Sequence, residues 1–237
     1  MSKTDKTVCW MLAAGLLFAA SLAGADDARA ESHIGFFGGL NLANMGGDMD
    51  DYGEEIAGEL EDEFGGNWTA SKGGEVGYGA GAYFFAPFAP EIGIQLEGQY
   101  IRRGVKFEIS GLGVDLATSI KSDYIEFPVL LRFSPGQGND MRPVLLMGPV
   151  VGFHSKTQLV TEVDGESISE DMSDGFKSTT FGLLFGAGLS VQSNEQMSFL
   201  MQVRYYMGLS NALDSETESS QSGDLGFFAG VELAIGG

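Results

Sequence analysis

The chain has 237 residues, a formal net charge of −20 at pH 7 and a mean hydropathy of +0.04. So acidic a chain repels phosphates, which argues against nucleic-acid binding. Apolar residues nevertheless make up 43% of the sequence, so charged and apolar residues must be segregated along it, within a length that suits one β-type domain.

The first thirty residues have the features of a secretory signal peptide. Lys3 and Lys6 give a positively charged start, an apolar run covers residues 11–25, and small residues follow. The run is shorter than the roughly 20 residues that a spanning helix needs, which favours a cleaved signal over a transmembrane helix. The only cysteine, Cys9, precedes the run. We therefore predict a signal peptide at 1–30 and a disulfide-free domain at 31–237.

Beyond the signal, apolar residues alternate with glycine or polar residues, which is the period of a strand and not of a helix. The alternation recurs in about eight stretches, which predict strands at 32–43, 76–86, 91–109, 118–133, 142–155, 179–191, 199–210 and 225–235. The fifth stretch is apolar on both faces, so its register is ambiguous. We expect its outward residues to be Leu145, Met147, Val151 and Phe153.

The connections between these stretches are alternately long and short. The long ones, taken as 44–75, 105–121, 155–177 and 211–224, contain 22 acidic residues and five lysines. One end of the molecule should therefore be long-looped and acidic, as the outer end of outer-membrane barrels is long-looped. Within the first loop Ile56 and Leu60 are four residues apart, which suits a short surface helix.

The apolar faces point either inward, as in a soluble barrel, or outward to lipid, as in a membrane barrel. The polar faces carry many glycines and few charges of both signs, which suits the narrow lumen of eight strands better than a water-exposed surface. We therefore predict an all-β, eight-stranded antiparallel up-and-down transmembrane β-barrel with a lumen filled by side chains. The polar network of its lumen is expected to contain Glu97, Glu126, Arg132, Arg204 and Glu232.

Five short strings occur in order along the chain: GGLNLAN at 38–44, the segment from QLE to RGV at 95–105, YIEFPVLL at 124–131, GPVVGF at 148–153 and RYYMGLSN at 204–211. Together they resemble the porin-like outer-membrane β-barrel family that includes PorT-type proteins. The resemblance covers roughly 34–235 and implies an eight-stranded barrel in the bacterial outer membrane with both termini in the periplasm. The resemblance implies no catalytic residue in this chain. Ile235 stands where barrels of this kind usually have an aromatic residue.

One segment nearly matches an EF-type calcium loop. Asp48, Asp50 and Glu59 occupy ligand positions and Gly53 the turn, but Tyr52 stands where an oxygen ligand is expected. The alternatives are a solvated acidic loop and loose binding of divalent cations by the dense carboxylates. We expect no other cofactor.

The two histidines, His33 and His154, are the candidates for hydrolytic chemistry, which needs a histidine near a serine and a carboxylate. His154 and Ser155 are adjacent in a strand and point to opposite faces, and His33 is expected at the other end of the barrel. We therefore predict no enzymatic activity.

Aromatic residues near the strand ends are expected to form girdles at the membrane interfaces. They are Tyr83, Tyr100, Phe107, Tyr124, Phe153 and Tyr205. Arg102 lies in the lipid-facing register, where it is expected either to meet lipid phosphates or to act as an ordinary interfacial charge.

The sequence predicts a structural or surface-interaction role: a rigid anchor that presents acidic loops to cations, lipopolysaccharide or a protein partner that the sequence does not name. Its other expected partners are outer-membrane lipid and the barrel-insertion machinery. One alternative is a small-solute channel or a PorT-like accessory of protein secretion. A second alternative is a soluble ligand-binding β-barrel.

Overall fold

The computed structural model describes residues 31–47, 52–112, 114–136, 140–163, 166–173, 177–210 and 220–235. The predicted signal peptide, Asp48 and Asp50 lie outside these residues. The described part contains one helix, α2 (Tyr52–Phe64), and nine strands. The strands are β1 (Ser32–Gly47), β2 (Trp68–Ala89), β3 (Ile92–Gly111), β4 (Val114–Phe133), β5 (Met141–Val163), β6 (Glu166–Asp171), β7 (Thr179–Asn194), β8 (Met197–Gly208) and β9 (Ser220–Ile235).

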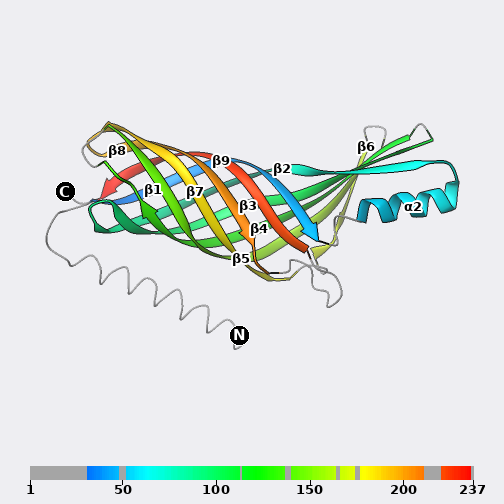
Figure 1. Ribbon diagram of the computed structural model, residues 1–237, viewed down its shortest axis with the longest axis horizontal. Coiled ribbons are helices and arrows are strands. Elements are labelled where there is room, and N and C mark those ends of the chain that lie inside the picture. The colour runs from blue at the N-terminus through cyan, green and yellow to red at the C-terminus, as the bar shows by residue number, and fades with distance from the viewer. Residues whose placement is uncertain are drawn as a thin grey trace, which may run out of the picture.

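Eight of these strands form a closed antiparallel ring (Figure 1). The order around the ring is β4-β3-β2-β1-β9-β8-β7-β5, and β4 pairs again with β5. β6 pairs with β5 outside the ring. Because a closed ring has no unpaired edge, its backbone groups are satisfied even in lipid. The predicted eight-stranded up-and-down barrel is confirmed, with β6 as a strand that the sequence did not predict.

Exposure alternates along the strands, and the large apolar side chains point outward. On β8 the exposed and buried residues alternate strictly over 198–208. Phe36 on β1, Met201 on β8 and Phe227 on β9 expose 52%, 56% and 59% of their surface. These side chains and their equivalents on the other strands form an apolar outer belt. The alternative of a soluble barrel, which needs them inside, is therefore wrong.

Strand β5 has the expected register. Leu145 and Met147 face outward, while Val144 and Leu146 between them are buried in the interior. The sequence of this strand does not alternate because its inner face packs against buried side chains while its outer face belongs to the apolar outer belt.

Strands β2 to β5 have 20 to 23 residues each, and their far ends extend beyond the ring (Figure 1). Much of the predicted loops 44–75, 105–121 and 155–177 is therefore strand, which corrects the sequence-based assignment. The inward face of this extension stays apolar, since Val105, Phe107, Ile109 and Ile120 are at most 2% exposed. Burial of these side chains stabilises the hairpin of β3 and β4 beyond the ring.

Helix α2 lies on this extension and packs against β2 and β3, as the spacing of Ile56 and Leu60 had predicted for a short helix. Ala57 on the packed side is buried. After the helix, Gly65 has a φ of +70°, and its N–H donates to the Glu61 carbonyl at 2.9 Å. A glycine in this left-handed conformation is a common C-terminal cap. The described part of the chain contains no helix both long and apolar enough to cross a membrane.

The two ends of the barrel differ. The connection at 90–91, the one between β4 and β5, and the turn at 195–196 lie at the end where Ser32 pairs with Ile235. Helix α2, the long hairpins and β6 lie at the opposite end (Figure 1). Because outer-membrane barrels have short periplasmic turns and long extracellular loops, we call the first end periplasmic and the second extracellular.

Candidate functional site

The interior of the ring contains three arginines, each paired with one or two carboxylates. From the periplasmic to the extracellular end the groups are Arg132 with Glu232, Arg204 with Glu97, and Arg103 with Glu126 and Asp224. Each of these side chains is at most 4% exposed. Charges buried this deeply are tolerated only when they are paired and hydrogen-bonded.

The pair nearest the periplasm is built around Glu232. Its carboxylate forms an ion pair with Arg132, and it accepts hydrogen bonds from Tyr83 Oη at 2.6 Å and Ser190 Oγ at 2.9 Å. Four strands, β2, β4, β7 and β9, thus meet at one carboxylate.

The middle pair is bidentate. Nη1 and Nη2 of Arg204 donate to the two carboxylate oxygens of Glu97 at 2.8 and 3.0 Å, and its Nε donates to Gln202 at 2.8 Å. The guanidinium carbon lies 4.3 Å from the ring centroid of Phe37 and 5.3 Å from that of Phe228. The aromatic rings exclude water and add cation–π attraction.

Gln95 connects these two pairs. Its Oε1 accepts from Arg132 Nη1 at 3.2 Å, and its Nε2 donates to Glu97 Oε1 at 2.5 Å. The side chain is fully buried. The two pairs therefore belong to one continuous hydrogen-bonded network.

The group nearest the extracellular end has one arginine between two carboxylates. Arg103 bonds Glu126 through Nη1 at 2.5 Å and through Nη2 at 3.3 Å, and its Nε bonds Asp224. Gln99 Nε2 donates to Glu126 at 2.8 Å. The guanidinium carbon lies 3.8 Å from the ring centroid of Tyr206.

The sequence predicted five of these seven charged residues and missed Arg103 and Asp224. Arg103 lies within the strand predicted at 91–109, and Asp224 lies at the end of segment 211–224, which was assigned to a loop. Their parity was nevertheless visible: Arg103 is an even number of residues from Glu97, and Asp224 is an even number from Glu232. The alternation of the strand predicted at 91–109 already places Arg103 inside, and extending the strand predicted at 225–235 by one residue would have placed Asp224 inside as well.

Two of the ion pairs cross the whole ring. Arg204 on β8 and Glu97 on β3 are four strands apart in either direction, and so are Arg132 on β4 and Glu232 on β9. The pairs therefore join opposite walls and occupy the axis of the lumen.

The interior also contains packed bulky apolar side chains, which differs from the expected filling of glycines and a few ions. A packed cluster of aliphatic side chains lines the wall formed by β4, β5, β7 and β8; its members are Leu130, Val144, Leu146, Val150, Leu184 and Leu200. Large apolar side chains therefore cover both the inner and the outer side of this wall.

The predicted aromatic girdle is only partly correct. Tyr83, Phe107 and Tyr124 are 3%, 0% and 2% exposed and point into the molecule. Tyr205 faces outward with 48% exposure, and Tyr100 lies on the outer side of β3. Proximity to a strand end predicts how far along the barrel axis an aromatic residue lies. It does not predict whether the side chain faces the lumen or the outside.

Arg102 lies on the outer side of β3 and is not free for lipid phosphates. Its Nε and Nη2 donate to the two oxygens of Asp123 at 2.6 and 2.8 Å, and its guanidinium lies over Tyr78. Tyr78 packs against Tyr100 with ring centroids 6.0 Å apart. This paired charge and the two tyrosines are typical of the extracellular membrane interface.

The other predicted sites do not assemble in the described residues. Glu59 is exposed on α2, so the second half of the predicted calcium loop is helical, and Asp48 and Asp50 lie outside the described residues. Among the described residues there is no group of three or more His, Cys, Asp or Glu that could hold a metal ion. The cation site therefore stays a prediction.

The two histidines lie at opposite ends of the barrel, as expected. His33 stacks on Phe85 at the periplasmic end, with ring centroids 5.9 Å apart. His154 contacts Thr157 Oγ1 through Nε2 at 2.7 Å near the extracellular end.

The comparison with protein families decides the class. A family model described as "Outer membrane protein beta-barrel domain" matches residues 24–214. The chain belongs to this family. It is a β-barrel protein of the bacterial outer membrane. A PorT-type relationship within that class stays a prediction.

Three solved outer-membrane proteins are among the structures that this chain is similar to, each at low identity. OprG from Pseudomonas aeruginosa is 17% identical with a TM-score of 0.46, and the match covers 88% of this chain and 98% of OprG. Neisserial surface protein A is 11% identical with a TM-score of 0.42, covering 88% and 100%. Ail of Yersinia pestis is 15% identical with a TM-score of 0.38, covering 85% and 99%. No curated relative matches the sequence.

Proposed function

We propose that this outer-membrane barrel is a closed, rigid anchor that presents an acidic surface outside the cell. The proposal depends mainly on the two ion pairs that cross the ring, Glu97 with Arg204 and Arg132 with Glu232. An eight-stranded barrel has an interior just wide enough for side chains to fill. Two guanidinium–carboxylate pairs on its axis leave no straight aqueous path.

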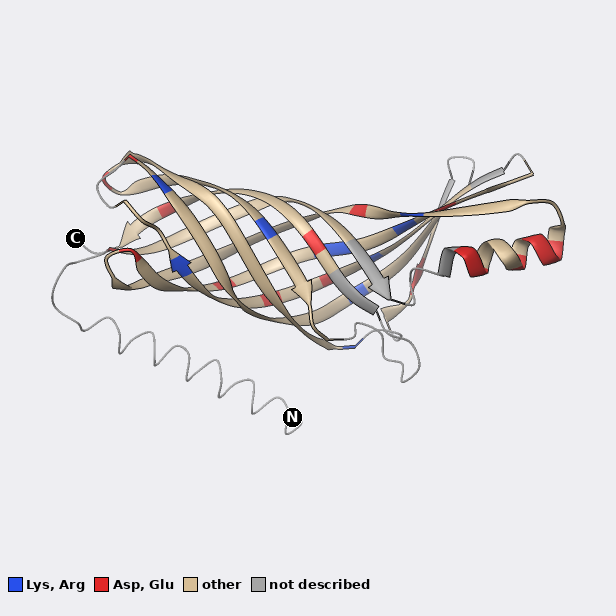
Figure 2. Ribbon diagram, in the orientation of Figure 1, with Lys and Arg blue, Asp and Glu red and all other residues tan. Residues whose placement is uncertain are grey.

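The presented surface is the extracellular extension with helix α2. The helix carries acidic residues and no base, and Figure 2 shows them as red bands along it. They are Glu54, Glu55, Glu59, Glu61, Asp62 and Glu63. Phe64 at the end of the helix and Leu112 at the tip of the β3–β4 hairpin expose 62% and 63% of their surface. A basic protein surface with apolar side chains complements this combination.

Lipopolysaccharide is a second partner class for this surface, but only through cations. Its phosphates and the acidic residues of α2 repel each other, so contact requires divalent cations between them. Binding that disappears with a chelator identifies this route, whereas a basic protein binds without divalent cations.

Conductance tests the closed lumen. The mature protein in a planar bilayer is expected to show no steady conductance of porin size. Removal of both charges by Glu97→Ala with Arg204→Ala opens the axis and is expected to increase conductance, whereas Arg102→Ala on the outer side of β3 leaves it unchanged. Steady conductance of the unmodified protein would instead support the alternative of a small-solute channel. A PorT-like role in secretion stays a prediction that no described contact favours.

A further inference from the structure

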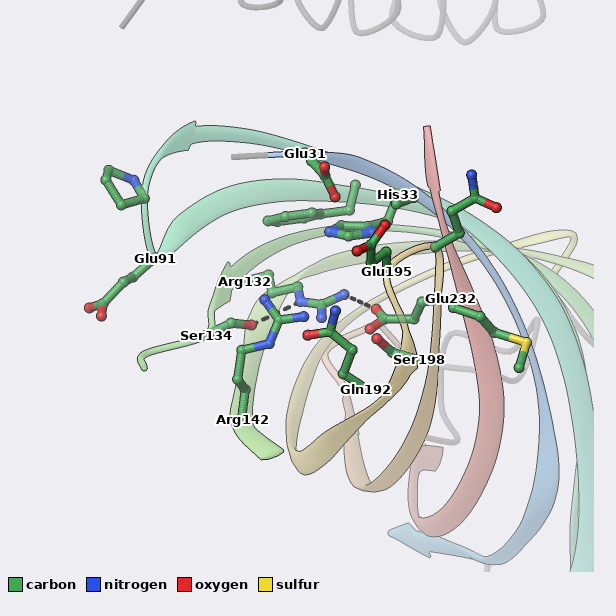
Figure 3. Close-up of a pocket in the computed structure, with 15 residues that line it drawn as sticks. Glu31, His33, Glu91, Arg132, Ser134, Arg142, Gln192, Glu195, Ser198 and Glu232 are labelled. Carbon is green, nitrogen blue, oxygen red and sulfur yellow. Dashed lines mark hydrogen bonds and ion pairs between the residues drawn. The ribbon is translucent and has the colours of Figure 1, made fainter. Parts of the chain in front are cut away.

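A pocket opens at the periplasmic end of the barrel, outside the Arg132–Glu232 pair (Figure 3). Its volume is about 190 Å³. Pockets for drug-sized ligands have volumes of roughly 300–1,000 Å³. This pocket is smaller and suits a molecule below drug size.

Arg142 of β5 projects into this pocket without a carboxylate partner. Of the five arginines in the described part of the chain, Arg102, Arg103, Arg132 and Arg204 all form ion pairs. Arg142 alone forms none among these residues. In Figure 3 its side chain points toward Arg132. An unpaired guanidinium beside a second one is a favourable place for a carboxylate, because the planar fork of arginine matches its two oxygens.

The mouth of the pocket has the opposite charge. Glu31, Glu91 and Glu195 line it, and Glu31 and Glu195 are exposed. Glu91 accepts the backbone N–H of Gly136 at 3.0 Å, which fixes its carboxylate. The pocket is thus positive where Arg142 enters and negative at the mouth. A simple anion is repelled by the mouth, and a simple cation is repelled by Arg142.

We propose that this pocket binds a small zwitterion, namely a free amino acid or a very short peptide with a free carboxylate and a free ammonium group. The carboxylate lies against Arg142, with Gln192 beside it, and the ammonium group lies toward Glu31 and Glu195. The Arg132–Glu232 pair closes the inner side of the pocket, so the ligand is held at the periplasmic end. The site is independent of the proposed extracellular role.

Calorimetric titration of the barrel in lipid nanodiscs tests this assignment. The probes are alanine, alanyl-alanine and trialanine, with alaninamide lacking the carboxylate and N-acetylalanine lacking the ammonium group. We expect saturable binding with one site for at least one of the first three, and at least about tenfold weaker binding of the two blocked probes. Tightest binding by alanine identifies a free amino acid, and tightest binding by the longer probes identifies a peptide.

Variants then locate the site. Arg142→Gln is expected to weaken binding at least about tenfold, and Arg142→Lys to retain part of it, since a lysine keeps the charge but not the fork. Glu195→Gln with Glu31→Gln is expected to weaken binding of alanine but not of N-acetylalanine. Lys156→Gln removes an exposed base from the same strand at the extracellular end and serves as the matched control. Heat-modifiable gel mobility verifies that each variant is folded.

Two results would overturn the assignment. One is the lack of saturable binding of all three zwitterions at millimolar concentrations. The other is binding that is equally strong in folded Arg142→Gln, or equally strong for alaninamide and alanine. Neither result depends on whether the lumen conducts, so this inference and the closed-anchor proposal fail separately.

Discussion

Glu97 on β3 and Arg204 on β8 form a bidentate ion pair across the full width of the barrel. The two N–O distances are 2.8 and 3.0 Å, and the residues are 107 positions apart in the sequence. The guanidinium lies near Phe37 and Phe228, so neither charge has water as an alternative partner. The pair therefore couples two opposite walls and makes each partner dependent on the other.

Removal of one partner is expected to be costly. Glu97→Ala leaves Arg204 buried without its carboxylate, and the free energy of unfolding should fall by about 3–5 kcal/mol. Denaturant unfolding in lipid vesicles, followed by circular dichroism, measures the change. Replacing both residues by methionine removes the unpaired charge and should recover most of the loss. If the double variant lost as much as the sum of the two single variants, the pair would not be coupled.

Two adjacent glycines on β1 are expected to respond differently to alanine. A Cβ at Gly39 would lie 2.0 Å from the Phe227 carbonyl oxygen, whereas a Cβ at Gly38 has its nearest neighbour at 3.6 Å. Gly39→Ala should therefore lower the free energy of unfolding by about 1–3 kcal/mol through overpacking. Gly38→Ala should change it by less than about 0.5 kcal/mol. Equal effects in a denaturant titration would contradict the close approach of β1 and β9.

If the apolar outer belt lies in lipid, a charged side chain on the outer face of β5 should lower the free energy of unfolding more, the closer it lies to the middle of the membrane. Met147 faces outward and is 53% exposed, and Ser155 is exposed nearer the extracellular end of the same strand. Met147→Arg should lower the free energy of unfolding in vesicles by about 2–4 kcal/mol, and Ser155→Arg by about 0–1 kcal/mol. The two variants are matched in charge and size, so a reversed order would place the membrane elsewhere along the barrel.

Helix α2 should gain stability when its last turn becomes basic. Glu61, Asp62 and Glu63 lie at the negative end of the helix dipole, and the last turn has no base. Glu63→Lys should stabilise the helix by about 0.3–1 kcal/mol at low ionic strength. Glu54→Lys in the first turn, where an acid is favourable, should destabilise it by a similar amount. Amide hydrogen exchange of residues 52–64 reports both changes, and high salt should reduce them.

The sequence by itself determined the strands, their faces and the class of protein. Successive side chains of a strand point to opposite faces, so a few residues are enough to show which face is apolar and which is polar. This assignment does not depend on where the strand lies in the fold. Leu145 and Met147 were therefore placed outside and Glu97 and Arg204 inside. The same local reasoning failed where an acidic composition masked the alternation, as at Asp224 in the segment assigned to a loop.

Only the tertiary structure decided which charges pair and where a pocket remains. Ring closure brings Glu97 against Arg204 and Glu232 against Arg132, and these contacts depend on the number of strands and their stagger, which no local pattern records. The same closure pairs the three arginines inside the ring, Arg103, Arg132 and Arg204, and leaves Arg142 without a carboxylate at the periplasmic mouth. Which charged side chains pair inside a barrel depends on their distance across the ring. Their separation along the sequence does not reveal that distance.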